Sequence, residues 1–347
     1  AGTIDLIYDE PMAAANLPPA TAFSVTINGG AAINPTAVSV AGNTVTLTFD
    51  PGVIVAGNLA LTLTYSDPTG GNDVAALQDA AGNDAASIAI VSGVTADGYI
   101  RGAQMYLEGP SGLIELTGVI TDDFGNFFLP SGANPDNYPL VAVGGVNIDT
   151  GLPNVAPLKA PAGSTTVNPL TTLVQAVIEQ AQSQGQTLDA QTAAGNVAAA
   201  LGLTLPVGQS LTSYDPLSST DPGAVDAQKA AAQVATLVTL AAGDSQNAEQ
   251  TAGQVLANLA TVVSNASAAA AQNPGQNVQV VLSDASVLAQ ALSGVTVSDA
   301  IQGSIFDANA AIAAASDIQD ISTAQSQFID RIAPSAPIRL LADAVTN

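Results

Sequence analysis

The sequence predicts a multidomain α+β protein, in which an N-terminal antiparallel β-sandwich is followed by a small β module and an alanine-rich α-helical bundle. Apolar residues alternate with a period of two between residues 3 and 65, and recur at helical spacing after residue 166. The 347 residues are enough for two or three domains. Hydrophobic residues make up 47 % of the chain, which indicates packed cores rather than a disordered acidic segment.

Residues 1–93 are the predicted sandwich. Four short runs place threonine or another polar residue between valine, leucine, isoleucine or phenylalanine, namely 3–8, 23–28, 44–49 and 59–65. This alternation is typical of strands with one buried face. Short strands at close spacing favour an immunoglobulin-like sandwich.

Three segments of this domain resemble a known repeat: DLIYDEPM (5–12), SVAGNTVTLTF (39–49) and LTLTYSDPTGGNDVAALQDAAGNDA (61–85). They are similar to the SwmB-type repeat, named after a cyanobacterial swimming-motility surface protein. The resemblance implies tandem β-sandwich modules in giant exported proteins, and it implies nothing enzymatic.

Residues 94–157 are the predicted small β module, with strands at 99–107, 113–120 and 127–129 and a turn at 122–126. The segments DGYIRGAQMYLEG (97–109) and TDDFGNFFLP (121–130) resemble a prealbumin-like β module of bacterial surface proteins. Relatives often carry a calcium-binding Asp/Asn-rich loop where this chain has Glu-Gly-Pro-Ser-Gly at 108–112, so the resemblance implies no metal there. Residues 131–165 are rich in Pro and Gly and are either a linker or a segment packed on the helices.

Residues 158–332 are the predicted helical domain. Its first part, 158–177, and the YDPL segment at 214–217 resemble the helical segment that commonly follows the prealbumin-like module. Pro169 and Asp221-Pro222 are typical of helix starts. The apolar spacing predicts helices from 169, then near 190–202, 222–243, 246–271, 282–292 and 304–331.

Residues 333–347 are predicted to be a linker into a further repeat. Residues 330–345 resemble the opening of an immunoglobulin-like repeat of biofilm adhesins, and the chain starts at Ala1 rather than at Met. We therefore expect it to be a piece of a longer repetitive protein, whose neighbouring repeats are its first partners.

The composition excludes several classes of function. With no Cys and no His, the chain has no thiolate nucleophile, no Ser–His triad and no usual zinc or haem ligands. A net charge of −24, from 5 basic and 29 acidic residues, disfavours nucleic acid and anionic membranes as partners. Aromatic residues are only 4 %, without Trp, which argues against a sugar-cleaving carboxylate pair in an aromatic cleft.

The remaining candidate site is a calcium site in the acidic turns of residues 1–93. Calcium takes six to eight oxygen ligands in flexible geometry, and this segment has no basic residue to relieve its carboxylates. The candidate ligands are the carboxylates of Asp9, Glu10, Asp67, Asp73, Asp79 and Asp84, with Asn72 and Asn83 beside them. Asp and Asn also favour turn and capping positions, so ordinary turn closure is the competing interpretation.

We therefore expect a non-catalytic, calcium-stabilised structural or adhesive module of a large secreted protein on the bacterial cell surface. Cell adhesion, biofilm formation and surface attachment are the expected roles, through self-association or a cell-surface or matrix ligand. The alternative is a subunit of a self-assembling surface layer (S-layer) or extracellular filament, which needs similar acidic, Cys-free modules.

Overall fold

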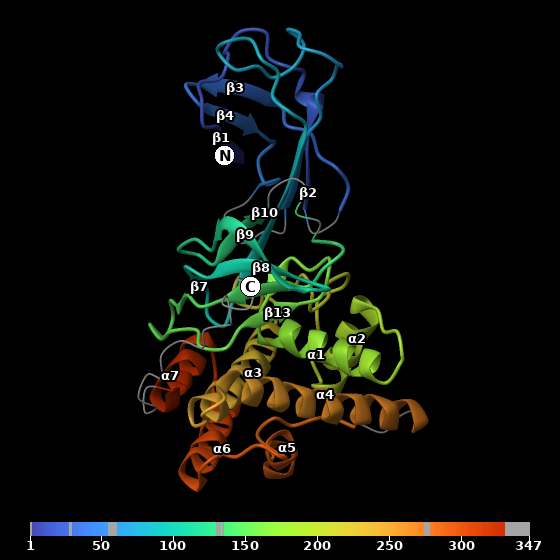
Figure 1. Ribbon diagram of the computed structural model, residues 1–347, viewed down its shortest axis with the longest axis vertical. Coiled ribbons are helices and arrows are strands. Elements are labelled where there is room, and N and C mark those ends of the chain that lie inside the picture. The colour runs from blue at the N-terminus through green and yellow to red at the C-terminus, as the bar shows by residue number, and fades with distance from the viewer. Residues whose placement is uncertain are drawn as a thin grey trace. The chain divides into compact units, whose positions relative to one another are not determined.

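The computed structural model describes residues 2–27, 30–54, 61–129, 133, 135–273 and 278–329. The fold is mixed α+β, with antiparallel sheets in the N-terminal part and helices α1–α7 in the C-terminal part (Figure 1). The chain divides into two compact units: unit 1 is residues 1–93 with 128–133, and unit 2 is residues 94–127 with 134–347. The predicted small β module and helical domain both lie in unit 2, and the boundary between them at residue 157 stays a prediction. The predicted tail lies outside the described residues.

Unit 1 contains two antiparallel sheets. One has the order β1-β4-β3, and the other contains the order β2-β5-β6. The strands are β1 (Thr3–Ile7), β2 (Phe23–Ile27), β3 (Ala37–Ala41), β4 (Thr44–Thr48), β5 (Leu61–Tyr65) and β6 (Ile88–Thr95), the last of which continues into unit 2. Strands β3 and β6 were not among the four predicted.

The core of unit 1 takes side chains from both sheets. Val45 and Leu47 on β4 are fully buried, while the threonines that alternate with them are partly exposed, so the period of two predicted for this strand is confirmed. Phe23 and Val25 on β2 and Tyr65 on β5 belong to the same apolar cluster. The Phe23 and Tyr65 rings stack with centroids 4.8 Å apart.

Unit 2 begins with a β region whose main sheet has the antiparallel order β13-β11-β8-β9, beside the pair β12-β7. Strand β14 pairs in parallel with the end of β6, where Thr166 lies opposite Val94. The strands are β7 (Ile100–Arg101), β8 (Gln104–Gly109), β9 (Gly112–Ile120), β11 (Leu140–Val143), β12 (Val146–Asn147), β13 (Leu158–Ala160) and β14 (Thr166–Val167). Strand β10 (Asn126–Leu129) begins in unit 2 and ends in unit 1.

For this region the structure corrects one expectation and decides between two alternatives for another. The single strand predicted at 99–107 is two strands, β7 and β8, because the chain turns at Gly102 with a φ of 75°. The segment 131–165 is no plain linker, since β11 and β13 lie within it and pair with each other and, through β11, with β8. Residues 135–165 therefore pack as part of unit 2.

The helices of unit 2 follow the predicted order closely. Asn168 caps α1 by accepting a hydrogen bond from the Thr171 N–H at 2.8 Å, and Pro169 occupies the first turn. Asp189 caps α2 in the same way through Thr192. The helices are α1 (Pro169–Ser183), α2 (Ala190–Ala200), α3 (Ala224–Gly243), α4 (Ala248–Gln272), α5 (Ala285–Ala291), α6 (Asp299–Ala314) and α7 (Ile318–Ile329).

The helix predicted at 304–331 is in fact two helices. Helix α6 ends before Ala315, whose backbone is extended at φ −58° and ψ 146°. The Asp317 side chain then accepts the Asp320 N–H at 2.8 Å, which starts α7. Ser316-Asp317 is thus a break and a new cap inside an otherwise helical pattern.

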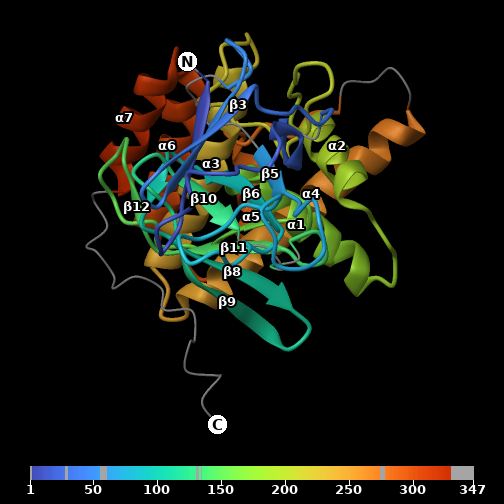
Figure 2. The same cartoon turned by 90° about the horizontal axis from the view of Figure 1, so that it is seen from above.

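The helical core is built largely from alanine, valine and leucine on α1–α6. Helix α3 is the most deeply buried, with Leu237, Leu240 and Ala241 fully covered. Figure 2 shows α6 and α7 side by side, and a small separate cluster joins Ile321 and Ala324 of α7 to Ala232 and Ile312. Alanine permits this close helix approach at little cost in side-chain entropy.

Candidate functional site

The predicted metal ligands lie in two segments of unit 1. Asp9 and Glu10 follow β1, and the other four lie in the loop between β5 and β6. Backbone bonds bring the segments together, because the Ala80 N–H donates to the Pro11 carbonyl at 2.9 Å. In the described part of the chain, however, no three carboxylates lie close enough together to hold a metal ion.

Asp79 closes a turn with its carboxylate. One oxygen accepts the N–H groups of Ala81 and Asn83, both at 2.8 Å, and the other accepts the Asn83 side-chain amide at 2.6 Å. The hydrogen bond from the Asn83 side chain, followed by that from its backbone, lowers the pKa of Asp79 below its usual range. The carboxylate is therefore held in its charged form by donors within its own turn.

Three other predicted ligands have similar roles. The Asp84 carboxylate accepts the Asp73 N–H at 3.0 Å and the Gln78 side-chain amide at 2.9 Å. Asp73 in turn accepts the Ala75 N–H at 2.8 Å. Asp67 accepts the Thr69 N–H at 3.0 Å. The bonds of Asp67 and Asp73 are the short-range bonds by which Asp residues close turns, whereas Asp84 connects residues 6 and 11 positions away within the loop.

The turn of Asp79 has a second copy in unit 2. Asp122 accepts the N–H groups of Phe124 and Asn126 at 2.8 Å through one oxygen, and the Asn126 amide at 3.0 Å through the other. Both turns share the sequence pattern Asp-x-x-Gly-Asn, at 79–83 and at 122–126, with the glycine at positive φ. Sequence analysis overlooked this repeated pattern, which predicts turn closure directly.

These observations bear on the calcium hypothesis. The carboxylates of Asp67, Asp73 and Asp79 close turns, and that of Asp84 connects two parts of the loop. The described residues do not form a preformed site with converging oxygens. The hydrogen bonds are those of the competing interpretation, turn closure. Calcium binding by this region stays a prediction, and no step of the function below depends on it.

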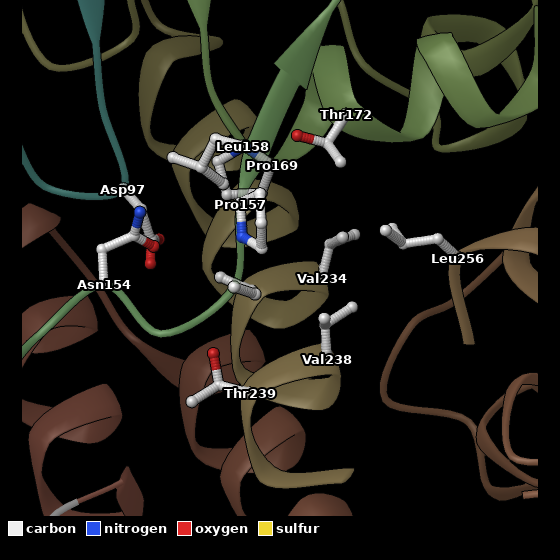
Figure 3. A pocket seen from close by; sticks show the side chains of 12 residues that line it. Asp97, Asn154, Pro157, Leu158, Pro169, Thr172, Val234, Val238, Thr239 and Leu256 are labelled. Atoms are coloured by element: carbon white, nitrogen blue, oxygen red, sulfur yellow. The ribbon is translucent and has the colours of Figure 1, made fainter. Parts of the chain in front are cut away.

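A different acidic residue, which sequence analysis did not single out, borders a cavity in unit 2. Asp97 and Asn154 line the same side of a space of about 20 Å³, while Val234 and Val238 project into it from α3 (Figure 3). The remaining lining is mostly apolar and comes from β13 and the residues just before it, and from α1, α3 and α4. A cavity of this size holds about one water molecule.

The environment of Asp97 favours its neutral form. Asp97 is half-buried as a residue, and desolvation of its carboxyl group raises the pKa from 3.8 to about 8. A hydrogen bond from Gln325 on α7, at 3.2 Å, acts in the opposite direction, and the nearby Asp149 raises the pKa further. Desolvation also raises the pKa of Asp149.

A carboxyl group with a raised pKa in a cavity is a feature of many catalytic acids. The Asp97 cavity is too small for a substrate, since it holds about one water. The chain also has no His or Cys to act as a base or nucleophile beside it. Asp97 is thus a half-buried acid beside a cavity that holds about one water molecule.

The YDPL segment singled out in the sequence connects the two parts of unit 2. The Tyr99 hydroxyl, just before β7, donates to the buried Asp215 carboxylate at 3.0 Å. The Thr212 carbonyl accepts the N–H groups of Thr165 and Thr166 at 2.9 and 3.1 Å. This segment thus fixes the start of the β region to the connection between α2 and α3.

Comparison with protein families finds one match. Residues 3–70 match the family described as "Putative flagellar system-associated repeat". The match supports a repeat-containing bacterial protein and confirms a repeat resemblance over these residues, but it stops short of residues 71–85, which formed part of the segment quoted above. No curated protein and no solved structure matches the chain.

Within the described residues, none of the helices combines the length and apolar character needed to cross a membrane.

Proposed function

We propose that this chain is a non-catalytic structural or adhesive segment of a large, repeat-built protein of the bacterial cell surface. The observation that carries the proposal is the repeat match over residues 3–70, which covers most of unit 1. In such a protein the repeat would be a spacer that carries other elements along an extended chain. Unit 2 would then be one such carried element.

The strand order of unit 1 supports an immunoglobulin-like sandwich. In that fold, one sheet has strands in the order A-B-E-D and the other contains C, F and G. If β1 corresponds to strand B, the observed orders β1-β4-β3 and β2-β5-β6 become B-E-D and C-F-G. Strand A has no counterpart among the described residues. Both sheets also contribute to one apolar core, as a sandwich requires.

The surface chemistry supports an extracellular, non-enzymatic role. Residues 1–93 contain acidic residues and no Lys or Arg, and the whole chain carries a charge of −24. Such a surface keeps repeats soluble and separated by repulsion. In the described part of unit 2, Asp97 is the acid with the most strongly perturbed environment, and its cavity admits no substrate.

Localisation and assembly test the proposal. Antibodies raised against the purified chain are expected to label intact cells of the source bacterium without permeabilisation, and electron micrographs of the purified chain should show isolated particles. Sheets or fibres in those micrographs would favour the alternative, a surface-layer or filament subunit. Labelling only after permeabilisation would contradict a surface role of either kind.

Calcium dependence is a separate prediction. If the acidic turns bind Ca²⁺ in the native state alone, millimolar Ca²⁺ raises the melting temperature of unit 1 by mass action, more than Mg²⁺ at equal ionic strength. Asp84→Asn should reduce the effect, whereas Asp50→Asn, at an exposed position of the same unit, should not. Identical melting curves in chelator, Ca²⁺ and Mg²⁺ would leave turn closure as the role of these carboxylates.

A further inference from the structure

The chain enters unit 2 on a strand that is paired in parallel. Unit 2 starts at Val94, near the end of β6, and residues 94–96 are named the entry strand. The Val94 N–H donates to the Thr165 carbonyl at 2.9 Å. Two residues further on, the Ala96 N–H donates to the Val167 carbonyl, also at 2.9 Å. These bonds join the entry strand to β14, and the two strands run in the same direction.

The entry strand is also held on its other side, and it is buried. The Thr95 N–H donates to the Gly125 carbonyl at 2.8 Å, and the Thr95 hydroxyl donates to the Met105 sulfur at 3.8 Å. The exposed fractions of Val94, Thr95 and Ala96 are 4 %, 0 % and 3 %. The first residues of unit 2 therefore lie inside it, with hydrogen-bond partners on both edges.

Strand β14 is anchored in the helical core. Asn168 follows Val167 directly and caps α1, so no loop separates the strand from the helix. The first ten residues of α1, 169–178, are all buried. Among them, Leu170 and Leu173 belong to the large apolar cluster of unit 2. The partner of the entry strand cannot move along its own axis without carrying α1 with it.

Tension on the chain acts on the entry strand along its axis. Because β6 is continuous from Ile88 to Thr95, a pull from its N-terminal side draws the entry strand backwards along its own direction. The hydrogen bonds to β14 run from strand to strand, across that direction, and so they resist together. A pull that parts two strands from one end instead breaks their hydrogen bonds one after another. The parallel arrangement thus places the stronger of these two geometries at the start of unit 2.

We propose that the entry strand and β14 form a mechanical clamp, which keeps unit 2 folded when the chain is pulled from its N-terminal side. The use of such a clamp rests on the proposed function, because a surface protein that attaches cells or matrix carries load along its chain. The clamp itself is a property of unit 2 and can be measured wherever the protein resides. Failure of the localisation test and failure of the clamp are therefore separate results.

Single-molecule pulling on the full chain tests the clamp. The sequence has no Cys, so pulling handles can be attached at chosen cysteines. Ala89→Cys on β6 combined with Ser183→Cys at the end of α1 pulls the two parallel strands from opposite ends. Ala89→Cys combined with Ala162→Cys, just before β14, pulls both strands from the same end. Ala89 and Ser183 are exposed and Ala162 is half-buried.

We expect the variant with handles at 89 and 183 to rupture at a clearly higher force than the variant with handles at 89 and 162. Both variants contain the same strands and hydrogen bonds, and forced unfolding is governed by the unfolding rate, so at equal loading rates the difference reports the direction of pulling. Equal melting temperatures of the two variants and the unchanged chain are the control for an unchanged fold. Equal rupture forces, or a lower force with handles at 89 and 183, would overturn the proposal.

Discussion

Replacing Gly125 by alanine is expected to destabilise unit 2 by about 2–4 kcal/mol. Gly125 has a φ of 74°, a left-handed conformation that costs an L-residue energy. An added Cβ would also lie 2.5 Å from the Thr95 carbonyl oxygen and 3.3 Å from the Ile100 nitrogen. These are backbone atoms, so the strands that carry them must shift to make room.

The second Asp-x-x-Gly-Asn turn offers a matched control. Gly82 occupies the equivalent position in the turn of Asp79, with a φ of 90°, and an added Cβ there would meet no atom within 4 Å. Gly82→Ala therefore carries the conformational strain without the collision, about 1–2 kcal/mol. The two variants separate the strain of the turn from the packing around it.

Circular dichroism at 222 nm follows unit 2 in this experiment, because helices α1–α7 all lie there. Urea unfolding of Gly125→Ala should show a clearly lower midpoint than the unchanged chain. Hydrogen exchange in β4 should report the smaller loss in unit 1 for Gly82→Ala. Equal losses for the two variants would mean that Thr95 and Ile100 do not constrain the turn as the structure indicates.

The local patterns in the sequence were sufficient for much of the fold. The alternation in Thr44–Thr48 predicted one buried face on β4, and Pro169 marked the start of α1, because both signals act over a few residues. The break at Ser316-Asp317 was missed because the flanking residues keep a helical pattern, although the local cap of Asp317 contained the signal.

Features made by distant residues could not be predicted in the same way. Strands β11, β13 and β14 are two to four residues long, and they are defined by partners such as Leu107 and Val94 rather than by their own alternation. The cavity beside Asp97 is lined by residues far along the chain, such as Val234 and Leu256, and the hydrogen-bond partner of Asp97, Gln325, is 228 residues away. Asp79 illustrates another limit, since an Asp-rich loop has the same residues whether its carboxylates bind cations or backbone N–H groups.

Removing the Tyr65 side chain should have the largest effect of any substitution in unit 1. Tyr65 is fully buried between the sheets, stacks on Phe23, and accepts the Leu77 N–H through its hydroxyl at 2.8 Å. Tyr65→Ala leaves a cavity and is expected to cost about 3–5 kcal/mol. Tyr65→Phe keeps the ring but leaves the Leu77 N–H without its acceptor, which should cost about 1–3 kcal/mol.

Tyr8 provides the matched control for the hydroxyl. Its hydroxyl is buried and has no hydrogen-bond partner among the described residues, and burial raises the pKa of Tyr8 to about 12. Tyr8→Phe therefore removes a desolvated hydroxyl that makes no hydrogen bond among the described residues, and should leave stability unchanged or slightly raised.

Native-state hydrogen exchange in β4 and β5 can measure all three variants on unit 1 alone. If Tyr8→Phe lost as much stability as Tyr65→Phe, the hydrogen bond from the Leu77 N–H would not explain the contribution of the Tyr65 hydroxyl. A clear difference between them would establish that the Tyr65 hydroxyl anchors the acidic loop, and with it the turns of Asp79 and Asp84, to the core of the repeat.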